Sequence, residues 1–279
     1  MMGRDKKTLT QRMSDMLLRS RWVSVVPRRG EEEVVDYSKT NLGGPSVLKP
    51  ESELRSKLFD WPDVAFSEAN CVASMFKAEP FKQLTAGDFG VDFTLADGHG
   101  TNHRLSNLLR EKPVIIASVT LSCPHCSAHA SAMANFAESY SQFHCVAVYV
   151  PQPHPERPET SFENGKIWEM PYSKGVKQER SLEERRASVL ILQKELGSRW
   201  LVLADDLRAT RVNPFWSTYG PAPRCSYLLD TSGLICHAQL WWEPPRAKKA
   251  ADAYLKAAAN ATAGRKQENE EEESKKGSS

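Results

Sequence analysis

Hydrophobic and polar positions follow a regular pattern only in the middle of the chain. The β-branched run at 113–119 and the apolar run at 144–150 are each typical of a strand buried on both faces. Between them, residues 127–140 carry an apolar stripe at helical spacing, made of Ala130, Met133, Ala134, Ala137 and Tyr140. A strand, a helix and a strand in this order predict a βαβ unit, with parallel strands and a right-handed crossover.

Later segments extend the same sheet. Ser181 and Glu184 form a capping box that begins a helix, and Gly197 ends this helix. Its apolar face consists of Leu182, Val189, Leu192 and Leu196. A third strand, an antiparallel hairpin around a Thr-Ser-Gly turn and a closing helix are predicted at 200–207, 225–242 and 246–259. The order β, α, β, α, β, β, β, α predicts an α/β domain with a central mixed sheet and helices on both faces.

The two ends of the chain lack such a period. Residues 1–84 are predicted to form an irregular extension that wraps the domain without folding alone, and 85–260 form the domain itself. Residues 261–279 are charged and of low complexity, so a disordered tail is predicted.

Composition narrows the function classes. The 279 residues include 37 basic and 35 acidic side chains, a net charge of +2, which is too balanced for nucleic-acid binding. No apolar run is long enough for a transmembrane segment. Six cysteines are too sparse for a disulfide scaffold and favour a reducing, cytoplasmic compartment. The basic arm at 1–29 leaves a mitochondrion or plastid as the alternative, although Asp5 and Asp15 argue against a transit peptide.

The strongest chemical signal is the pair Cys123 and Cys126, which follows the strand at 113–119 and begins the helix. A helix N-terminus and the adjacent His125 favour a thiolate on Cys123, while Cys126, one turn into the helix, can resolve an adduct. A zinc half-site and a merely structural pair are the alternatives. Zinc needs two more ligands, for which Cys225 and Cys236 on the hairpin are candidates, but no second short Cys or His pair exists.

Other polar and aromatic residues are weaker candidates. His154 follows the strand at 144–150 and is therefore expected at the same sheet edge as Cys123. It is a candidate proton donor or acceptor, and the alternative is a surface histidine. Pro223 precedes a hairpin strand, where a cis bond would expose backbone groups to a substrate and an ordinary trans proline is the alternative. Cys145 is expected to be inert core. Three histidines, His129, His144 and His237, are expected to be structural or solvated. The aromatic residues Trp241 and Trp242 and the segment 214–216 either line an aromatic groove or belong to the core.

Several segments together resemble known families. The element order with its Cys-x-x-Cys resembles the thioredoxin fold, and 92–100 followed by 112–119 is similar to the first strands of redoxins. The segments at 148–155, 182–187, 201–207 and 219–235 resemble the iodothyronine deiodinase family and its bacterial relatives, so that the likeness extends over roughly 88–258. The resemblance implies a thioredoxin-like domain with a reactive residue at the end of its first core strand.

The resemblance also implies roles for individual residues. Cys123, followed by Pro124, stands at the family's selenocysteine or cysteine, and His154 stands at its histidine. Gln152 replaces an acidic residue that the family uses in proton transfer, and an amide cannot exchange a proton in that way. Cys126 is an addition, and it completes a Cys-Pro-His-Cys motif similar to that of DsbA-type oxidants.

These observations predict a thiol-dependent oxidoreductase with Cys123 as nucleophile and Cys126 as resolving thiol. The expected substrate is a disulfide, a peroxide or a halogenated aromatic, and a thioredoxin- or glutathione-type thiol would supply electrons without a bound cofactor or metal. The alternatives are a deiodinase-type reductive dehalogenase, a thiol peroxidase and a non-enzymatic zinc-binding or interaction module. Both a monomer and a homodimer fit the sequence.

Overall fold

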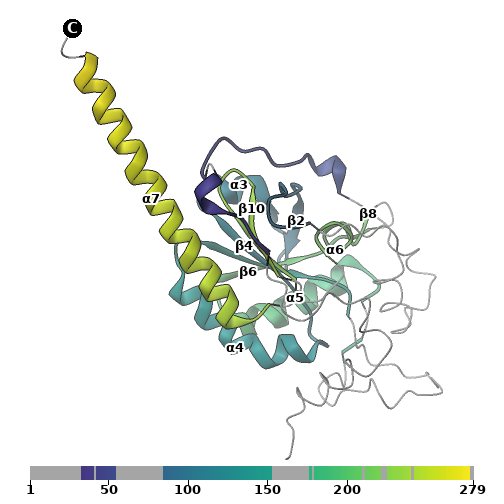
Figure 1. The fold of residues 1–279 in the computed structure, drawn as a ribbon. Coiled ribbons are helices and arrows are strands. Elements are labelled where there is room, and N and C mark those ends of the chain that lie inside the picture. Colours follow the sequence, from purple (N-terminus) through teal and green to yellow (C-terminus); the bar gives the residue numbers. More distant parts are fainter. Residues whose placement is uncertain are drawn as a thin grey trace, which may run out of the picture.

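The computed structural model describes residues 33–40, 42–54, 84–152, 176–177, 179–208, 211–220, 225–239 and 242–276. Figure 1 shows a central twisted sheet with helices packed on it. The fold is α/β and thioredoxin-like, as the order of elements predicts. No helix in the described part of the chain is both long and apolar enough to span a membrane.

Eight strands form the sheet in the order β1-β10-β9-β4-β5-β6-β2-β3. β4, β5 and β6 run parallel in its centre, whereas β9 is antiparallel to β4 and β2 is antiparallel to β6. The bounds are β1 Glu33–Val34, β2 Thr94–Asp97, β3 Asn102–Arg104, β4 Val114–Val119, β5 His144–Tyr149, β6 Trp200–Ala204, β9 Ser226–Leu229 and β10 Ile235–Gln239. The parallel β4–β5 pair and the antiparallel β9–β10 hairpin are confirmed.

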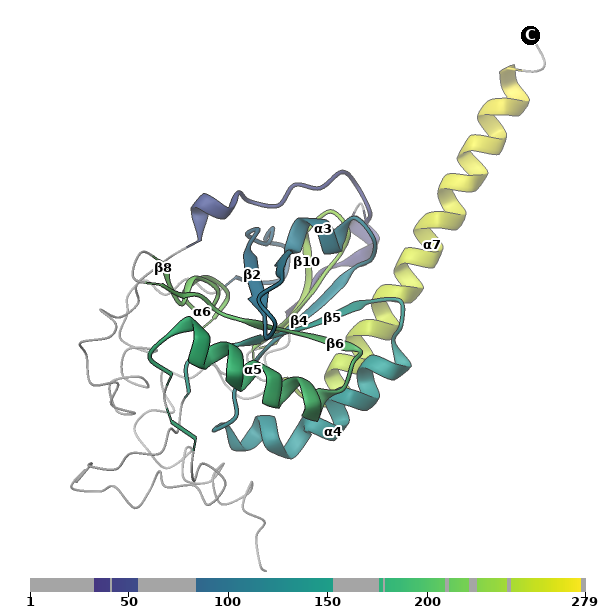
Figure 2. The ribbon, with the colours of Figure 1, turned by 180° about the vertical axis from the view of Figure 1, so that it is seen from behind.

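Helices cover both faces of the sheet (Figures 1 and 2). α4, α5 and α7 pack on one face, whose core includes Met133, Val189 and Ala251. α3 and α6 pack on the other face, through residues such as Leu105 and Phe215. The helices are α3 Leu105–Leu109, α4 Pro124–Ser139, α5 Leu182–Leu196, α6 Pro214–Tyr219 and α7 Pro244–Lys276. The shorter elements are two 3-10 turns, Tyr37–Lys39 and Glu51–Glu53, and an antiparallel pair of strands, β7 Leu207–Arg208 and β8 Arg211–Val212.

The helix boundaries follow local chemistry. Ser181 accepts a hydrogen bond from the Glu184 amide (3.1 Å) at the start of α5, as the capping box predicts. Gly197 ends α5 with a φ of 78°, a conformation that glycine adopts without steric cost. The N-terminus of α6 is not capped by its own N-cap residue, as that of α5 is. Its cap is the carboxylate of Asp205, the residue that follows β6.

The C-terminal segment differs from the prediction of a disordered tail from residue 261. α7 continues to Lys276, and its distal part projects away from the domain (Figure 1). Residues 261–276 contain Glu, Lys, Ala, Arg and Gln, which are strong helix formers, so this segment continues the helix that packing begins nearer the domain.

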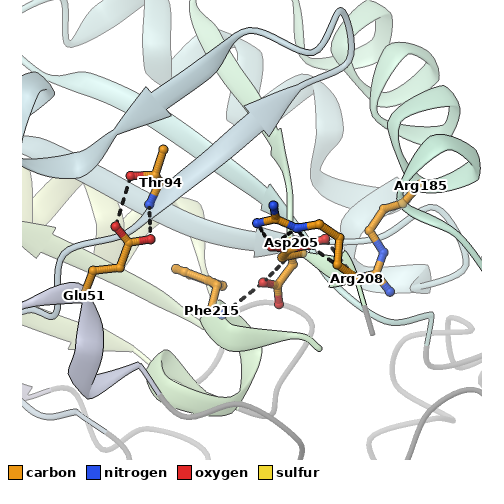
Figure 3. A network of polar contacts seen from close by, with 7 residues as sticks. Glu51, Thr94, Arg185, Asp205, Arg208 and Phe215 are labelled. Atoms are coloured by element: carbon orange, nitrogen blue, oxygen red, sulfur yellow. Dashed lines mark hydrogen bonds and ion pairs between the residues drawn. The ribbon is translucent and has the colours of Figure 1, made fainter. Parts of the chain in front are cut away.

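The described part of the N-terminal extension lies along the domain. Val34 pairs with His237 at the edge of β10, and the Gly43 amide donates to the Asp230 carboxylate (3.1 Å). The Glu51 carboxylate accepts two hydrogen bonds from Thr94 on β2, from the amide and the hydroxyl (Figure 3). The described residues of this segment thus contact the domain at β10, at Asp230 and at β2.

Aromatic side chains bind α4 to α7. The ring of Trp242 meets that of Phe136 edge-on, and Phe136 stacks on Tyr140 at 4.6 Å between ring centroids. The Tyr140 hydroxyl donates to the Asp252 carboxylate of α7 (2.7 Å). Trp242 and the whole of α6 are buried, so these aromatics belong to the core and do not line an open groove. Trp241 lies outside the described residues.

Candidate functional site

Cys123 and Cys126 lie where β4 ends and α4 begins. Cys123 is the N-cap residue, with extended backbone angles (φ −82°, ψ 118°), and Pro124 occupies the first helical position. Proline suits that position because its fixed φ is helical and no partner is needed there for a backbone N–H. The N-cap position lies at the N-terminus of α4, where the partial positive charge of the helix dipole favours an anion such as a thiolate.

Both residues carry a thiol, and both are buried, with 2% of Cys123 and 4% of Cys126 exposed. The two residues belong to the core on the α4 face of the sheet. The amide of Ser127 donates to the Cys123 carbonyl (3.2 Å), which closes the first turn of α4. One turn of helix therefore holds the two cysteines in a fixed relation at the carboxyl edge of the sheet, where open α/β sheets place their sites.

The other three described cysteines, Cys145, Cys225 and Cys236, are buried, and burial raises the pKa of each thiol. Burial raises the pKa of Cys145 to about 12 and that of Cys225 to about 11. Cys145 is 3% exposed in the core, as expected for an inert residue. Cys225 belongs to the core on the opposite face of the sheet from Cys123, and its sulfur lies 3.1 Å from the Ser118 hydroxyl. Among the described residues, no group of three or more His, Cys, Asp or Glu side chains is placed to hold a metal ion.

Gln152 anchors the turn that carries Cys123. Its side chain is completely buried, and its Oε1 accepts a hydrogen bond from the amide of Ser122, the residue before Cys123 (3.0 Å). Its Nε2 donates to the Glu179 carboxylate (3.1 Å) and contacts the Tyr149 hydroxyl. A carboxylate only accepts hydrogen bonds, so Glu179 fixes the orientation of the amide and leaves Oε1 facing Ser122.

Glu179 is the centre of this buried polar network. Its Oε1 also accepts hydrogen bonds from the hydroxyls of Tyr149 (2.9 Å) and Ser188 (2.8 Å). Burial and the charge of Glu179 hold the pKa of Tyr149 well above its usual value. Glu179 was not predicted from the sequence. Its position two residues before the helix cap was the available signal, but no sequence pattern connects it with Gln152.

Replacing Gln152 with leucine is expected to slow the reaction of Cys123 with a small neutral disulfide by about tenfold, because the Ser122 amide loses its acceptor and the reactive turn loosens. Stopped-flow rates with bis(2-hydroxyethyl) disulfide would measure this. Gln193→Leu is the matched control: Gln193 bonds Gly197, Trp200 and Val202 at the opposite end of α5. Equal slowing in both variants would contradict a specific role for Gln152.

A second buried polar cluster lies at the same edge of the sheet (Figure 3). Arg185 is 0% exposed, and its Nη1 donates to the Asp205 carbonyl (3.0 Å) and to Asn213 Oδ1 (2.6 Å). The Asp205 carboxylate accepts hydrogen bonds from the Phe215 and Trp216 amides (3.0 and 2.9 Å) and so caps α6. Burial raises the pKa of Asp205 to about 6, although the charge of Arg185 acts in the opposite direction.

Arg185 was not predicted from the sequence either. It shares the spacing of Val189, Leu192 and Leu196, which form the buried face of α5, so its position indicated burial even though its charge suggested the surface. Asn213 has a φ of 47°, uncommon for a residue other than glycine. The Asn213 side chain accepts a hydrogen bond from Arg185 and does not cap α6. The Asp205 carboxylate caps α6 instead.

The structure thus brings together Cys123, Cys126 and Gln152 of the predicted site residues. His154 and Pro223 lie outside the described residues, as do the side chains of Pro124 and His125. The structure describes the three histidines that were predicted to be structural or solvated. The His129 ring meets Trp242 edge-on at 6.4 Å, and His144 lies 3.1 Å from Glu111 near the surface. His237 is buried, which lowers its pKa to about 4.

Comparisons with known proteins agree with this geometry at a coarse level. The model of the AhpC/TSA family matches residues 86–173, the segment that contains β4, both cysteines, α4 and β5. A search of curated proteins gave no significant match. The family match places the cysteine pair within a redoxin-type segment, and it covers less than half of the chain.

Several solved structures have a similar backbone fold over part of this chain. A secreted disulfide oxidoreductase of Mycobacterium tuberculosis, homologous to E. coli DsbE, is 13% identical, with a TM-score of 0.39, over 58% of this chain and 95% of its own. A thiol peroxidase from Chromobacterium violaceum is 12% identical, with a TM-score of 0.42, over 63% of this chain and 90% of its own. At these identities, the activity has to be argued from the site itself.

Proposed function

We propose that the protein is a thiol–disulfide oxidoreductase in which Cys123 is the nucleophile and Cys126 the resolving thiol. The observation that carries the proposal is the placement of two cysteine thiols at the N-cap and in the first turn of α4. The redoxin match over residues 86–173 supports the same chemistry. Cys145, on β5, and Cys225, just before β9, are not at a helix N-terminus, and their raised pKa values make them poor nucleophiles.

The reaction has two exchange steps. The Cys123 thiolate attacks one sulfur of the substrate disulfide, the substrate S–S bond breaks, and the departing thiolate takes up a proton. The Cys126 thiolate then attacks the Cys123 sulfur, which forms the Cys123–Cys126 disulfide and releases the second substrate thiol. Two electrons pass from the protein to the substrate. An external thiol, either a small molecule or a thioredoxin-type protein, restores the dithiol, so no bound cofactor takes part.

A thiol peroxidase is the second candidate. The Cys123 thiolate would attack a peroxide oxygen to give a sulfenic acid and an alcohol or water, and Cys126 would condense with the sulfenic acid to release water. Thr120, three residues before Cys123, has a buried hydroxyl without a hydrogen-bond partner among the described residues, and such a hydroxyl favours a small polar substrate. Reductive dehalogenation has less support, because Gln152 holds its amide in a fixed network and has no exchangeable acid proton.

The test uses Cys126→Ser, which removes the resolving thiol. We expect this variant to accumulate a mixed disulfide on Cys123 when treated with bis(2-hydroxyethyl) disulfide, whereas the wild-type protein passes on to the internal disulfide. Intact-mass and peptide mass spectrometry would locate the adduct. Cys225→Ser is the control and should behave as the wild type. A variant that forms no adduct, or forms it on another cysteine, would contradict the proposal; sulfenic acid trapped with dimedone after peroxide treatment would favour the peroxidase.

A further inference from the structure

Gln152 separates a buried carboxylate from the turn that carries Cys123. The Glu179 carboxylate accepts a hydrogen bond from Gln152 Nε2 (3.1 Å), and Gln152 Oε1 accepts one from the Ser122 amide (3.0 Å). Two hydrogen bonds and the width of one amide group therefore lie between the carboxylate and the backbone beside Cys123. Gln152 and Ser122 are fully buried and Glu179 is 4% exposed, so little water screens a charge here.

The contacts of Glu179 favour its charged form. Its Oε1 accepts hydrogen bonds from the Tyr149 and Ser188 hydroxyls as well as from Gln152. Donors that point at a carboxylate stabilise the anion over the acid. The negative charge of Glu179 also contributes to the raised pKa of Tyr149. The core thus holds an anion near the reactive turn, and the distance of this anion from Cys123 affects the thiol.

A negative charge directly beside Cys123 would oppose the proposed chemistry. The N-cap position of Cys123 favours a thiolate, because the helix N-terminus carries a partial positive charge. A like charge nearby favours the protonated thiol instead. A glutamate at position 152 would accept the same hydrogen bond from Ser122, but it would bring its charge to within one hydrogen bond of this backbone. An amide oxygen accepts that bond without carrying a full charge.

We infer that Gln152 is a neutral spacer, which holds the turn before Cys123 through an uncharged acceptor and keeps the negative charge of Glu179 away from the reactive sulfur. Gln152 is therefore a positioning residue that tunes Cys123 and does not itself touch the substrate. The inference rests on the proposed role of Cys123 as nucleophile. It explains how a core that contains a carboxylate preserves a thiolate at this place.

The elements around the N-terminal end of α4 carry other titratable or charged groups. Among those that the structure describes are Cys126 and His129 on α4, Tyr149 on β5, Arg185 on α5, Asp205 after β6 and Tyr254 on α7. An exchange of the side chains at positions 152 and 179 leaves all of these groups in place. Such an exchange therefore tests the location of a single charge.

The experiment uses the double variant Gln152→Glu/Glu179→Gln, which moves the charge but keeps the net charge of the protein. Cys126→Ser in every protein leaves Cys123 as the only thiol of the pair. The ultraviolet absorbance of the Cys123 thiolate is recorded against pH, with Cys123→Ser/Cys126→Ser as the blank, so no reagent has to reach the buried sulfur. We expect the midpoint of this ionisation to be about one pH unit higher in the double variant, because the repulsion between two negative charges grows as their distance falls.

A control and a second variant accompany this measurement. Ser188→Ala removes one hydrogen bond to Glu179 without moving a charge and should keep the original midpoint. Gln152→Glu alone should also raise the midpoint, so the inference stays testable if circular dichroism shows that the exchanged pair does not fold. A raised midpoint supports the spacer role even if Cys123 reacts with no disulfide, in which case only the proposed function fails. An unshifted midpoint in both glutamate variants, or an equal rise in Ser188→Ala, would overturn the inference and leave the exchange reaction in place.

Discussion

Replacing Cys123 with serine is expected to lower the rate of disulfide reduction by about a thousandfold or more, because an alcohol has almost none of the nucleophilicity of a thiolate toward sulfur. Its N-cap position makes the effect specific: serine is itself a good N-cap residue, so α4 should remain folded. Insulin or bis(2-hydroxyethyl) disulfide reduction, coupled to an external dithiol, would measure the rate.

Two further variants complete this test. Cys126→Ser should retain the first exchange step and lose only turnover, since the nucleophile is still present. Cys225→Ser should retain both, because Cys225 lies on the opposite face of the sheet. Residual turnover in Cys123→Ser close to that of the wild type would mean that another thiol is the nucleophile, and the assignment of the N-cap cysteine would be wrong.

Replacing Asp205 with alanine is expected to destabilise the fold by about 3–5 kcal/mol, the usual cost of removing one partner from a buried charged cluster. The variant leaves the Phe215 and Trp216 amides without an acceptor and Arg185 without its nearby negative charge. Urea unfolding monitored by circular dichroism would give the free energy of unfolding. A loss below about 1 kcal/mol would show that this cluster contributes little.

The effect of pH on Asp205 has a defined sign. Its pKa is about 6 in the folded protein against 3.8 for an unperturbed aspartate, so the folded state binds more protons between these values and gains stability as the pH falls from 6 towards 4. Asp205→Asn cannot take up this proton. The free-energy cost of Asp205→Asn should therefore be about 2 kcal/mol larger at pH 4.5 than at pH 7.5. A cost independent of pH would contradict the raised pKa.

The sequence predicted the features that depend on local pattern. The apolar runs at 113–119 and 144–150, with the helix between them, placed the cysteine pair at the carboxyl edge of a parallel sheet, and β4, α4 and β5 confirm this. The capping box and Gly197 located both ends of α5. These features could be predicted because each depends on residues only a few positions apart in the chain.

Features that depend on distant contacts could not be predicted in this way. Gln152 looked like a lost acid, and only the folded chain shows that its amide joins Ser122 to Glu179, a residue 27 positions further along. Arg185 was not predicted as a buried residue, yet it lies on the buried face of α5. Its donors meet Asp205 and Asn213 only because β6 ends beside the start of α5. His154 and Pro223 stay predictions from the sequence.

The distal part of α7 affects how the size of the protein is judged in solution. Beyond Arg265, whose side chain still bonds the Leu42 carbonyl, the helix extends for about 16 Å at 1.5 Å per residue. Such a rod adds friction out of proportion to its mass, so a monomer of 31.3 kDa should elute from a sizing column earlier than a compact sphere of that mass. Light scattering, which measures mass independently of shape, is therefore the measurement that distinguishes an elongated monomer from a homodimer.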